Sequence, residues 1–237
     1  MSDSQRAAEQ YDAMGAAYAA ANADNTYNTH YERPAMRRLV GDVAGLDVLD
    51  VGCGPGVLAQ QLVDDGARLT AADVSPRMVE LASARLGPEV AVHLADLASP
   101  LTFAESDSYD LVVASLVLHY LRDWEPVLTE LRRVLKPNGR LVVSTHHPSM
   151  DWRFHSPDDY FALKQVTETW TKGGVGYPVT FWRRPLRAMS EAIAISGFLI
   201  QRMVEPEPVP QLQEINAKDY ARLTTEPTFL FFDLRRS

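Results

Sequence analysis

The sequence has little of what secreted or membrane-spanning chains usually contain. Its 237 residues include one cysteine, Cys53, so no disulfide can form within the chain, which suits a reducing compartment. The longest uncharged apolar stretch, LVVASLVLHYL, is too short to cross a bilayer. The first residues, MSDSQRAAEQ, lack the basic segment and apolar run of a secretion signal. We therefore predict a cytoplasmic protein with no membrane partner.

Positive charge is also scarce. Lysine and arginine number 23 against 31 aspartate and glutamate residues, which gives a formal net charge of −8. A chain with this charge repels phosphate backbones, so a nucleic-acid partner is not expected. The composition leaves the oligomeric state open.

Apolar residues, by contrast, make up 46% of the chain, enough for a sizeable core. In the middle of the chain, β-like apolar runs alternate with helical patterns, which is typical of a parallel sheet with crossover helices. The predicted strands lie in LDVLDV, ARLTAADV, VAVHLAD, the start of YDLVVASLVLHY, and RLVVSTHH, the last preceded by a KPNG turn.

The chain divides into four parts within one predicted domain. Residues 1–45 form an N-terminal helical cap, and residues 46–148 form the alternating core. Residues 149–184 contain two β-like runs, QVTETW and PVTFW, and are predicted to be an antiparallel insertion on the substrate side. Residues 185–237 supply a last helix and the C-terminal strands.

The first predicted strand runs into VGCGPG, where Gly52, Gly54 and Gly56 alternate with other residues. Glycines between a strand and a helix permit positive φ and let a nucleotide-like ligand approach the backbone. The spacing differs from the G-x-G-x-x-G of dinucleotide folds, because Val57 takes the third place, and the lysine of a phosphate loop is missing. A tight strand-to-helix turn with no ligand is the alternative interpretation.

Acidic residues near the ends of three predicted strands narrow the range of candidate ligands. Asp73 can accept hydrogen bonds from both hydroxyls of a ribose, since Ser75 already provides a helix N-cap. Asp96 can accept from an adenine amino group or be an ordinary turn residue. Asp50, just before the glycines, would repel a diphosphate and attract an ammonium or sulfonium group. These residues imply an adenosine with a cationic tail, which is S-adenosylmethionine.

Five ordered motifs carry a family resemblance. They are VLDVGCGPG, AADVSPRMVELA, Asp96-Leu97, SYDLVVASLVLHYL and LKPNGRLVVSTHHP. Together they resemble class I S-adenosylmethionine-dependent methyltransferases, and more narrowly the bacterial small-molecule branch related to ubiquinone-biosynthesis methyltransferases. The match covers residues 46–148, and the C-terminal runs FLIQRMVEPEP and EPTFLFFDLRR also resemble that branch.

The resemblance implies an α/β fold with a Rossmann-like, seven-stranded, mostly parallel sheet and helices on both faces. It also implies transfer of a methyl group to an O, N or C atom of a small organic acceptor, with S-adenosylmethionine as cofactor and S-adenosylhomocysteine as product. A protein that binds these nucleosides without transferase activity is the main alternative. A nicotinamide oxidoreductase conflicts with the glycine spacing, and an RNA methyltransferase conflicts with the net charge.

Position by position, the resemblance assigns the methionine end of the cofactor to the glycine loop. Gly52, Cys53 and Gly54 would line the methionine part, and Asp50 would assist its amino group directly or through water. Ser115–Leu116 would face the sulfonium end.

The nucleoside end is assigned in the same way. Asp73 would hold the ribose, and Val74 and Met78 would lie against the adenine. Asp96 and Leu97 would bind the adenine edge.

Two N-terminal tyrosines and one arginine have two interpretations each. Tyr11 and Tyr18 resemble tyrosines that close over the cofactor, and packing of an amphipathic helix on the sheet is an equal alternative. Arg33 can meet the methionine carboxylate, but a solvated helix charge is the favoured role.

Three histidines follow the fourth and fifth predicted strands, at the edge where such sheets bind ligands. One of His146 and His147 is the preferred general base, with a loop histidine bonded to backbone as the alternative. His119 is favoured as pocket lining rather than as a base. No metal site is predicted, because neighbouring residues such as His146 and His147 point apart on an extended chain and cannot share a metal with Asp151.

Overall fold

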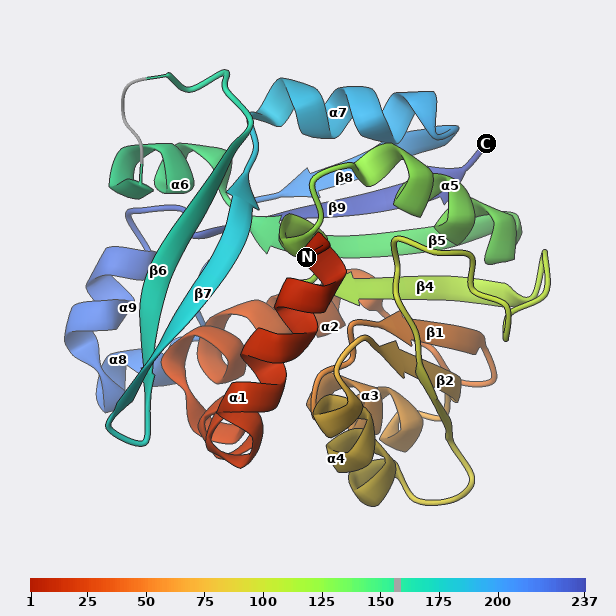
Figure 1. Ribbon diagram of the computed structural model, residues 1–237, viewed down its shortest axis with the longest axis horizontal. Coiled ribbons are helices and arrows are strands. Elements are labelled where there is room, and N and C mark those ends of the chain that lie inside the picture. The colour runs from red at the N-terminus through yellow and green to blue at the C-terminus, as the bar shows by residue number, and fades with distance from the viewer. Residues whose placement is uncertain (156–158) are drawn as a thin grey trace.

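The computed structural model describes residues 1–155 and 159–237 (Figure 1). Its centre is a seven-stranded sheet with the strand order β3-β2-β1-β4-β5-β9-β8. Strands β1 to β5 are parallel, and β9 pairs antiparallel with both β5 and β8. The predicted Rossmann-like, mostly parallel sheet is confirmed.

The strands of the sheet lie close to the predicted runs. They are β1 (Asp47–Val51), β2 (Arg68–Asp73), β3 (Ala91–Leu94), β4 (Tyr109–Ser115), β5 (Leu135–His146), β8 (Phe198–Val204) and β9 (Phe229–Arg236). β5 begins before the KPNG segment, which the sequence predicted to be a turn. Tyr109 pairs with Leu135 and Leu111 pairs with Arg140, so the segment is an irregularity inside a continuous strand, with φ of 64° at Asn138.

Helices cover both faces, because residues alternate across each strand and give the sheet two apolar sides. In β1, Val48 packs into one buried cluster and Leu49 into another. The first cluster includes side chains of α2 (Arg33–Val40), α3 (Val57–Asp64), α4 (Pro76–Leu86), α8 (Gln211–Ile215) and α9 (Ala217–Leu223). The second includes side chains of α5 (Trp124–Val134) and α7 (Leu186–Ile195).

A third layer crosses the carboxyl ends of the strands (Figure 1). It consists of α1 (Asp3–Asp24) and the antiparallel hairpin of β6 (Lys164–Lys172) and β7 (Val175–Arg183). Ala7 and Met14 of α1 form a small core with Val179 and Phe181 of β7. The hairpin is the antiparallel insertion that the sequence predicts after the fifth strand, and residues 156–158 of that insertion lie outside the described residues.

The remaining elements are short and connect these layers. They are the π-helical turn η1 (Asn28–Glu32), the 3-10 turn η2 (Leu118–Tyr120) and α6 (Pro148–His155). The helical N-terminal cap is interrupted at Gly15, whose φ of 42° kinks α1, because glycine has no Cβ to oppose that conformation. Within the part of the chain that the structure describes, no helix combines the length and apolarity needed to cross a membrane.

The sheet topology brings the predicted site residues close together. β1 lies between β2 and β4. The sheet extends from β1 through β2 to β3 on one side and through β4 to β5 on the other. In parallel sheets, ligands bind beyond the carboxyl ends of the strands at this switch point. The loops after β1, β2, β3 and β4 therefore meet there, beneath α1.

Candidate active site

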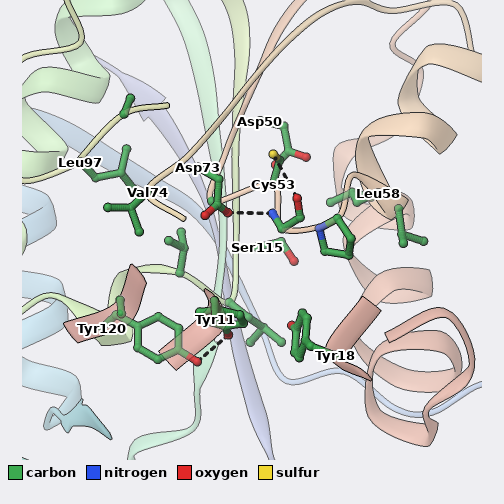
Figure 2. Close-up of a pocket in the computed structure, with 18 of the residues that line it drawn as sticks. Tyr11, Tyr18, Asp50, Cys53, Leu58, Asp73, Val74, Leu97, Ser115 and Tyr120 are labelled. Atoms are coloured by element: carbon green, nitrogen blue, oxygen red, sulfur yellow. Dashed lines mark hydrogen bonds between the residues drawn. The ribbon is translucent and has the colours of Figure 1, made fainter. Parts of the chain in front are cut away.

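One cavity lies at the switch point, with an empty volume of about 970 Å³ including its open mouth (Figure 2). Every predicted cofactor residue except Met78 lines it. These residues are Tyr11, Tyr18, Asp50, Gly52, Cys53, Gly54, Asp73, Val74, Asp96, Leu97, Ser115 and Leu116. Met78 is fully buried in α4, so the structure does not bring it to the cavity surface.

The glycine loop forms one wall of the cavity. The backbone N–H groups of Gly52 and Cys53 both donate to the carbonyl of Ala72, at 2.8 and 3.1 Å, which ties the loop to β2. Gly52 has φ of 69°, and a Cβ there would lie 2.4 Å from Cγ2 of Val117. Gly54 also has positive φ, but a Cβ there would meet nothing within 4 Å. Gly52 is therefore needed for packing, whereas Gly54 leaves backbone open to a ligand.

Asp73 is oriented by the loops on either side of it. Its Oδ2 accepts from the N–H of Gly54 and its Oδ1 from the N–H of Ser75, both at 2.9 Å. Burial raises the pKa of Asp73, and the backbone hydrogen bonds act in the opposite direction. Since each carboxylate oxygen has a second lone pair, the side chain can still accept two hydroxyl hydrogens from a ribose.

Asp50 is the least satisfied group in the cavity. The residue is 1% exposed, and neither of its carboxylate oxygens has a hydrogen-bond partner. Burial raises its pKa to about 7, and the charges of Asp73 and Glu32 act in the same direction. An unpartnered buried carboxylate is costly unless a cation compensates it. The residue thus fits the cationic tail that the sequence implies.

Two further charged residues line the cavity: Glu32, which was not recognised from the sequence, and Arg33, for which a solvated helix charge was the favoured role. Glu32 lines the cavity at 2% exposure, and its Oε1 accepts from the hydroxyls of Ser115 and Ser144 at 2.8 and 2.6 Å. Burial raises the pKa of Glu32, although these two hydrogen bonds lower it. Arg33 also lines the cavity and is 7% exposed, so its favoured role as a solvated charge is wrong. Glu32 ends η1 and Arg33 begins α2, so the junction of these two elements carries both side chains to the cavity.

The N-terminal tyrosines line the cavity and pack against their neighbours at the same time. The hydroxyls of Tyr11 and Tyr120 are 2.7 Å apart, and the ring of Tyr18 meets that of Tyr11 edge-on at 4.9 Å. Burial raises the pKa of Tyr11 well above its usual value. Helix α1 is held in this position partly by Gln10, whose side-chain oxygen accepts from the N–H of Thr180 in β7.

A second cavity, of about 1660 Å³ including its open mouth, adjoins the first. The two share a set of lining residues, namely Tyr11, Tyr18, Asn28, Leu116 and Tyr120. Aromatic rings form much of the second cavity's wall, namely Tyr27, Phe154, Trp170, Phe181 and Phe229. Titratable and charged groups also face it, namely His119, His146, Asp151, His155, Glu168, Lys172 and Arg222.

Two of the predicted histidines meet in this second cavity. The rings of His119 and His146 stack with centroids 4.0 Å apart, and Nδ1 of His146 lies 3.3 Å from Oδ1 of Asp151. Burial lowers the pKa of His146, but the Asp151 carboxylate outweighs it, so the net pKa is raised. Burial lowers the pKa of His119 well below its usual value, and His146 adds to this effect.

The third histidine points elsewhere. His147 does not line either cavity, and its ring nitrogens lie 2.8 Å from Oε1 of Glu205 and 2.7 Å from the hydroxyl of Ser149. Burial lowers the pKa of His147, partly offset by Glu205. Of the two candidate bases, only His146 lines the second cavity, which adjoins the first. Among the described side chains, no group of three or more His, Cys, Asp and Glu residues could hold a metal ion.

Comparison with known proteins agrees with this geometry. Residues 49–143 match the family model described as a methyltransferase domain. The chain is 33% identical over 155 residues to demethylmenaquinone methyltransferase of Lactococcus lactis, covering 62% of this chain and 61% of the relative. It is 35% identical over 107 residues to ubiquinone biosynthesis O-methyltransferase of Xanthomonas oryzae, covering 44% of each chain. The matches thus span less than two thirds of these relatives.

A solved structure extends the likeness over most of the chain. It is an S-adenosylmethionine dependent methyltransferase from Mesorhizobium loti, with a TM-score of 0.69 and 27% sequence identity. The alignment covers 86% of this chain and 96% of that one. The matches support a class I S-adenosylmethionine-dependent methyltransferase related to those of quinone biosynthesis, with S-adenosylmethionine as cofactor.

Proposed function

We propose that this protein transfers the methyl group of S-adenosylmethionine to an O, N or C atom of a small organic acceptor. The observation that carries the proposal is the pair Asp50 and Asp73 in one cavity. Asp50 is a buried carboxylate without a partner, and Asp73 is a carboxylate with free accepting positions. The first suits the cationic end of the cofactor and the second suits its ribose.

The remaining cavity residues take the roles that follow from their places. Val74, Asp96 and Leu97 lie beyond β2 and β3 and would surround the adenine. Gly52, Cys53 and Gly54 would follow the methionine part along the loop, with Arg33 available to its carboxylate. Tyr11 and Tyr18 of α1 would cover the bound cofactor, and Ser115 with Leu116 would lie at its sulfonium end.

The second cavity is the proposed acceptor site. Leu116 and Tyr120 line both cavities, so an acceptor there adjoins the cofactor. Bound S-adenosylmethionine supplies a methyl group already activated on a sulfonium sulfur. The protein's task is then to align the acceptor and exclude water. The acceptor atom bonds to the methyl carbon, and the carbon–sulfur bond breaks with its electron pair left on sulfur.

His146 is the proposed base for an acceptor that must lose a proton. It faces the acceptor cavity, and Asp151 stabilises the imidazolium formed when it takes that proton. His119, whose pKa burial lowers, stacks on His146 and would serve as neutral lining. His147, held by Glu205 and Ser149, is not proposed as a base.

The main alternative is a protein that binds S-adenosylmethionine or S-adenosylhomocysteine without transferring a methyl group. A large aromatic cavity beside the cofactor cavity favours transfer, because a binding module needs no second site. RNA methylation is disfavoured by the net charge of −8.

Titration calorimetry of the purified chain tests the proposal. We expect micromolar binding of S-adenosylmethionine and S-adenosylhomocysteine, on the order of 1–100 μM, and none of NADH. Asp73→Ala should abolish this binding while circular dichroism stays unchanged, whereas Asp64→Ala, an exposed acid in α3, should bind as the wild type does. Binding with no methyl transfer across a broad acceptor panel would favour the alternative.

A further inference from the structure

The cofactor cavity contains more negative than positive charge. Among its described lining residues, Glu32, Asp50, Asp73 and Asp96 are acidic, and Arg33 is the only lysine or arginine. Glu32, Asp50 and Asp73 are 2%, 1% and 8% exposed, so solvent screens their charges little. The positive charge of the methionine tail accounts for the carboxylate of Asp50, and the ribose hydroxyls account for the carboxylate of Asp73. Neither explains Glu32.

Glu32 is fixed where the two cavities meet. The hydroxyls of Ser115 and Ser144 both donate to its Oε1, and the N–H of Leu116 donates to the hydroxyl oxygen of Ser144 at 3.0 Å. Leu116 lines both cavities. In Figure 2, Ser115 lies between the loop residues Asp50 and Asp73 and the tyrosines. Glu32 therefore sits beside the part of the cavity proposed for the sulfonium.

A glutamine could accept the same two hydroxyl hydrogens. A neutral side chain would also avoid the cost of burying a charge next to Asp50, which already lacks a partner. The carboxylate is thus costly in the protein alone, where Arg33 is the charged side chain that favours its ionised form, and a cation entering the cavity would compensate it further. The charge of Glu32, rather than its hydrogen bonds, is what requires a role.

We propose that Glu32 makes the cavity prefer a sulfonium to the thioether that remains after methyl transfer. This inference rests on the proposed function. S-adenosylmethionine carries an ammonium, a carboxylate and a sulfonium, whereas S-adenosylhomocysteine lacks the sulfonium charge. A buried carboxylate attracts a unit positive charge more strongly than water-screened groups do. Loss of that charge during transfer weakens binding, so the product leaves and a new cofactor molecule replaces it.

Calorimetric titration of the full chain with three ligands tests the preference. They are S-adenosylmethionine, S-adenosylhomocysteine, and sinefungin, in which an amine-bearing carbon replaces the sulfonium. We expect the wild type to bind the two cationic ligands roughly tenfold more tightly than S-adenosylhomocysteine. In Glu32→Gln the cationic ligands should weaken until the three affinities lie within about twofold, with S-adenosylhomocysteine unchanged. Glu191→Gln, which removes an exposed charge on α7, should keep the wild-type ratio.

The outcomes separate this inference from the proposed function. If the wild type binds all three ligands equally, or Glu32→Gln keeps the wild-type ratio, the preference does not come from Glu32. If the wild type binds none of them, the proposed function itself fails. Should Glu32→Gln lose its folded circular dichroism spectrum, equal wild-type affinities for sinefungin and S-adenosylhomocysteine would still overturn the inference.

Discussion

Nδ1 of His146 lies 3.3 Å from Oδ1 of Asp151, and both residues are buried at the wall of the second cavity. Asp151, with a smaller contribution from Glu168, keeps the pKa of His146 above its usual value, against the effect of burial. The pair thus sets the basicity of a side chain next to the proposed methyl-acceptor site. The effect of Asp151 on the pKa of His146 can be measured before any methyl acceptor is known.

Asp151→Asn should lower the pKa of His146, because burial is then opposed only by the weaker effect of the Glu168 charge. The expected result is a fall in the pKa of His146 relative to the wild type. An NMR titration of the imidazole carbon-bound hydrogens measures it. Glu205→Gln, which alters the partner of His147, is the matched control and should leave His146 unchanged. A titration curve of His146 that is identical in Asp151→Asn would contradict the pairing.

Asp50→Asn should stabilise the ligand-free protein, and more so at higher pH. The folded pKa of Asp50, about 7, lies above its ordinary value of 3.8. The folded state is therefore penalised progressively as pH rises from 3.8 to 7, and asparagine removes this penalty. Between about pH 5 and pH 8, the gain in unfolding free energy over wild type should grow by about 3 kcal/mol.

Urea denaturation at the two pH values measures this gain. Asp64→Asn, an exposed acid in α3, should show no comparable change with pH. An equal gain for Asp50→Asn at both pH values would mean that Asp50 is ionised in the folded protein at about pH 5 as well.

Gly52→Ala should destabilise the fold much more than Gly87→Ala. Both glycines have positive φ, 69° and 77°, so alanine is strained at each by about 1–2 kcal/mol. A Cβ at Gly52 would also clash with Val117 at 2.4 Å, whereas a Cβ at Gly87 meets nothing within 4 Å. We expect a further loss of roughly 2 kcal/mol or more for Gly52→Ala, measured by chemical denaturation. Equal losses would show that Val117 moves aside freely.

Arg33→Met should weaken the binding of S-adenosylmethionine about tenfold or more, because it removes the lysine or arginine charge available to the methionine carboxylate. Methylthioadenosine, which has neither the carboxylate nor the amine of methionine, should bind unchanged. Arg37→Met is the control on the same helix, since Arg37 is exposed and pairs with Asp65. Equal weakening of both ligands in Arg33→Met would indicate a general disturbance of the cavity.

Much of the cofactor cavity was predictable because its residues follow directly on from strands. Asp50 and the glycines are next to each other in the chain, and Asp73 ends β2. Adjacent parallel strands bring such ends together at one edge of the sheet, so local sequence was enough to place them. Met78 is the exception, because the direction of its side chain depends on how α4 packs, and it is buried away from the cavity.

Other features depended on tertiary structure. His146 and His147 are neighbours with the same chemistry, but successive side chains of an extended chain point to opposite sides, so pairing determines which one faces the cavity. His146 pairs with Phe229 of β9, about eighty residues later in the chain, and the backbone N–H of His147 donates to Thr228. The register between β5 and β9 cannot be predicted from a local sequence pattern.

The sequence by itself determined the sheet, the glycine loop and the acids at its strand ends, because these rest on local periodicity and on adjacency in the chain. Only the tertiary structure decided the roles of Glu32 and Arg33, which lie in a helical segment whose pattern resembles that of an ordinary surface helix. Glu32 is buried where the end of η1 meets β4 and β5, through its hydrogen bonds with Ser115 and Ser144. Contacts between residues more than eighty positions apart hold Glu32 at the cavity, and a single sequence does not specify such contacts.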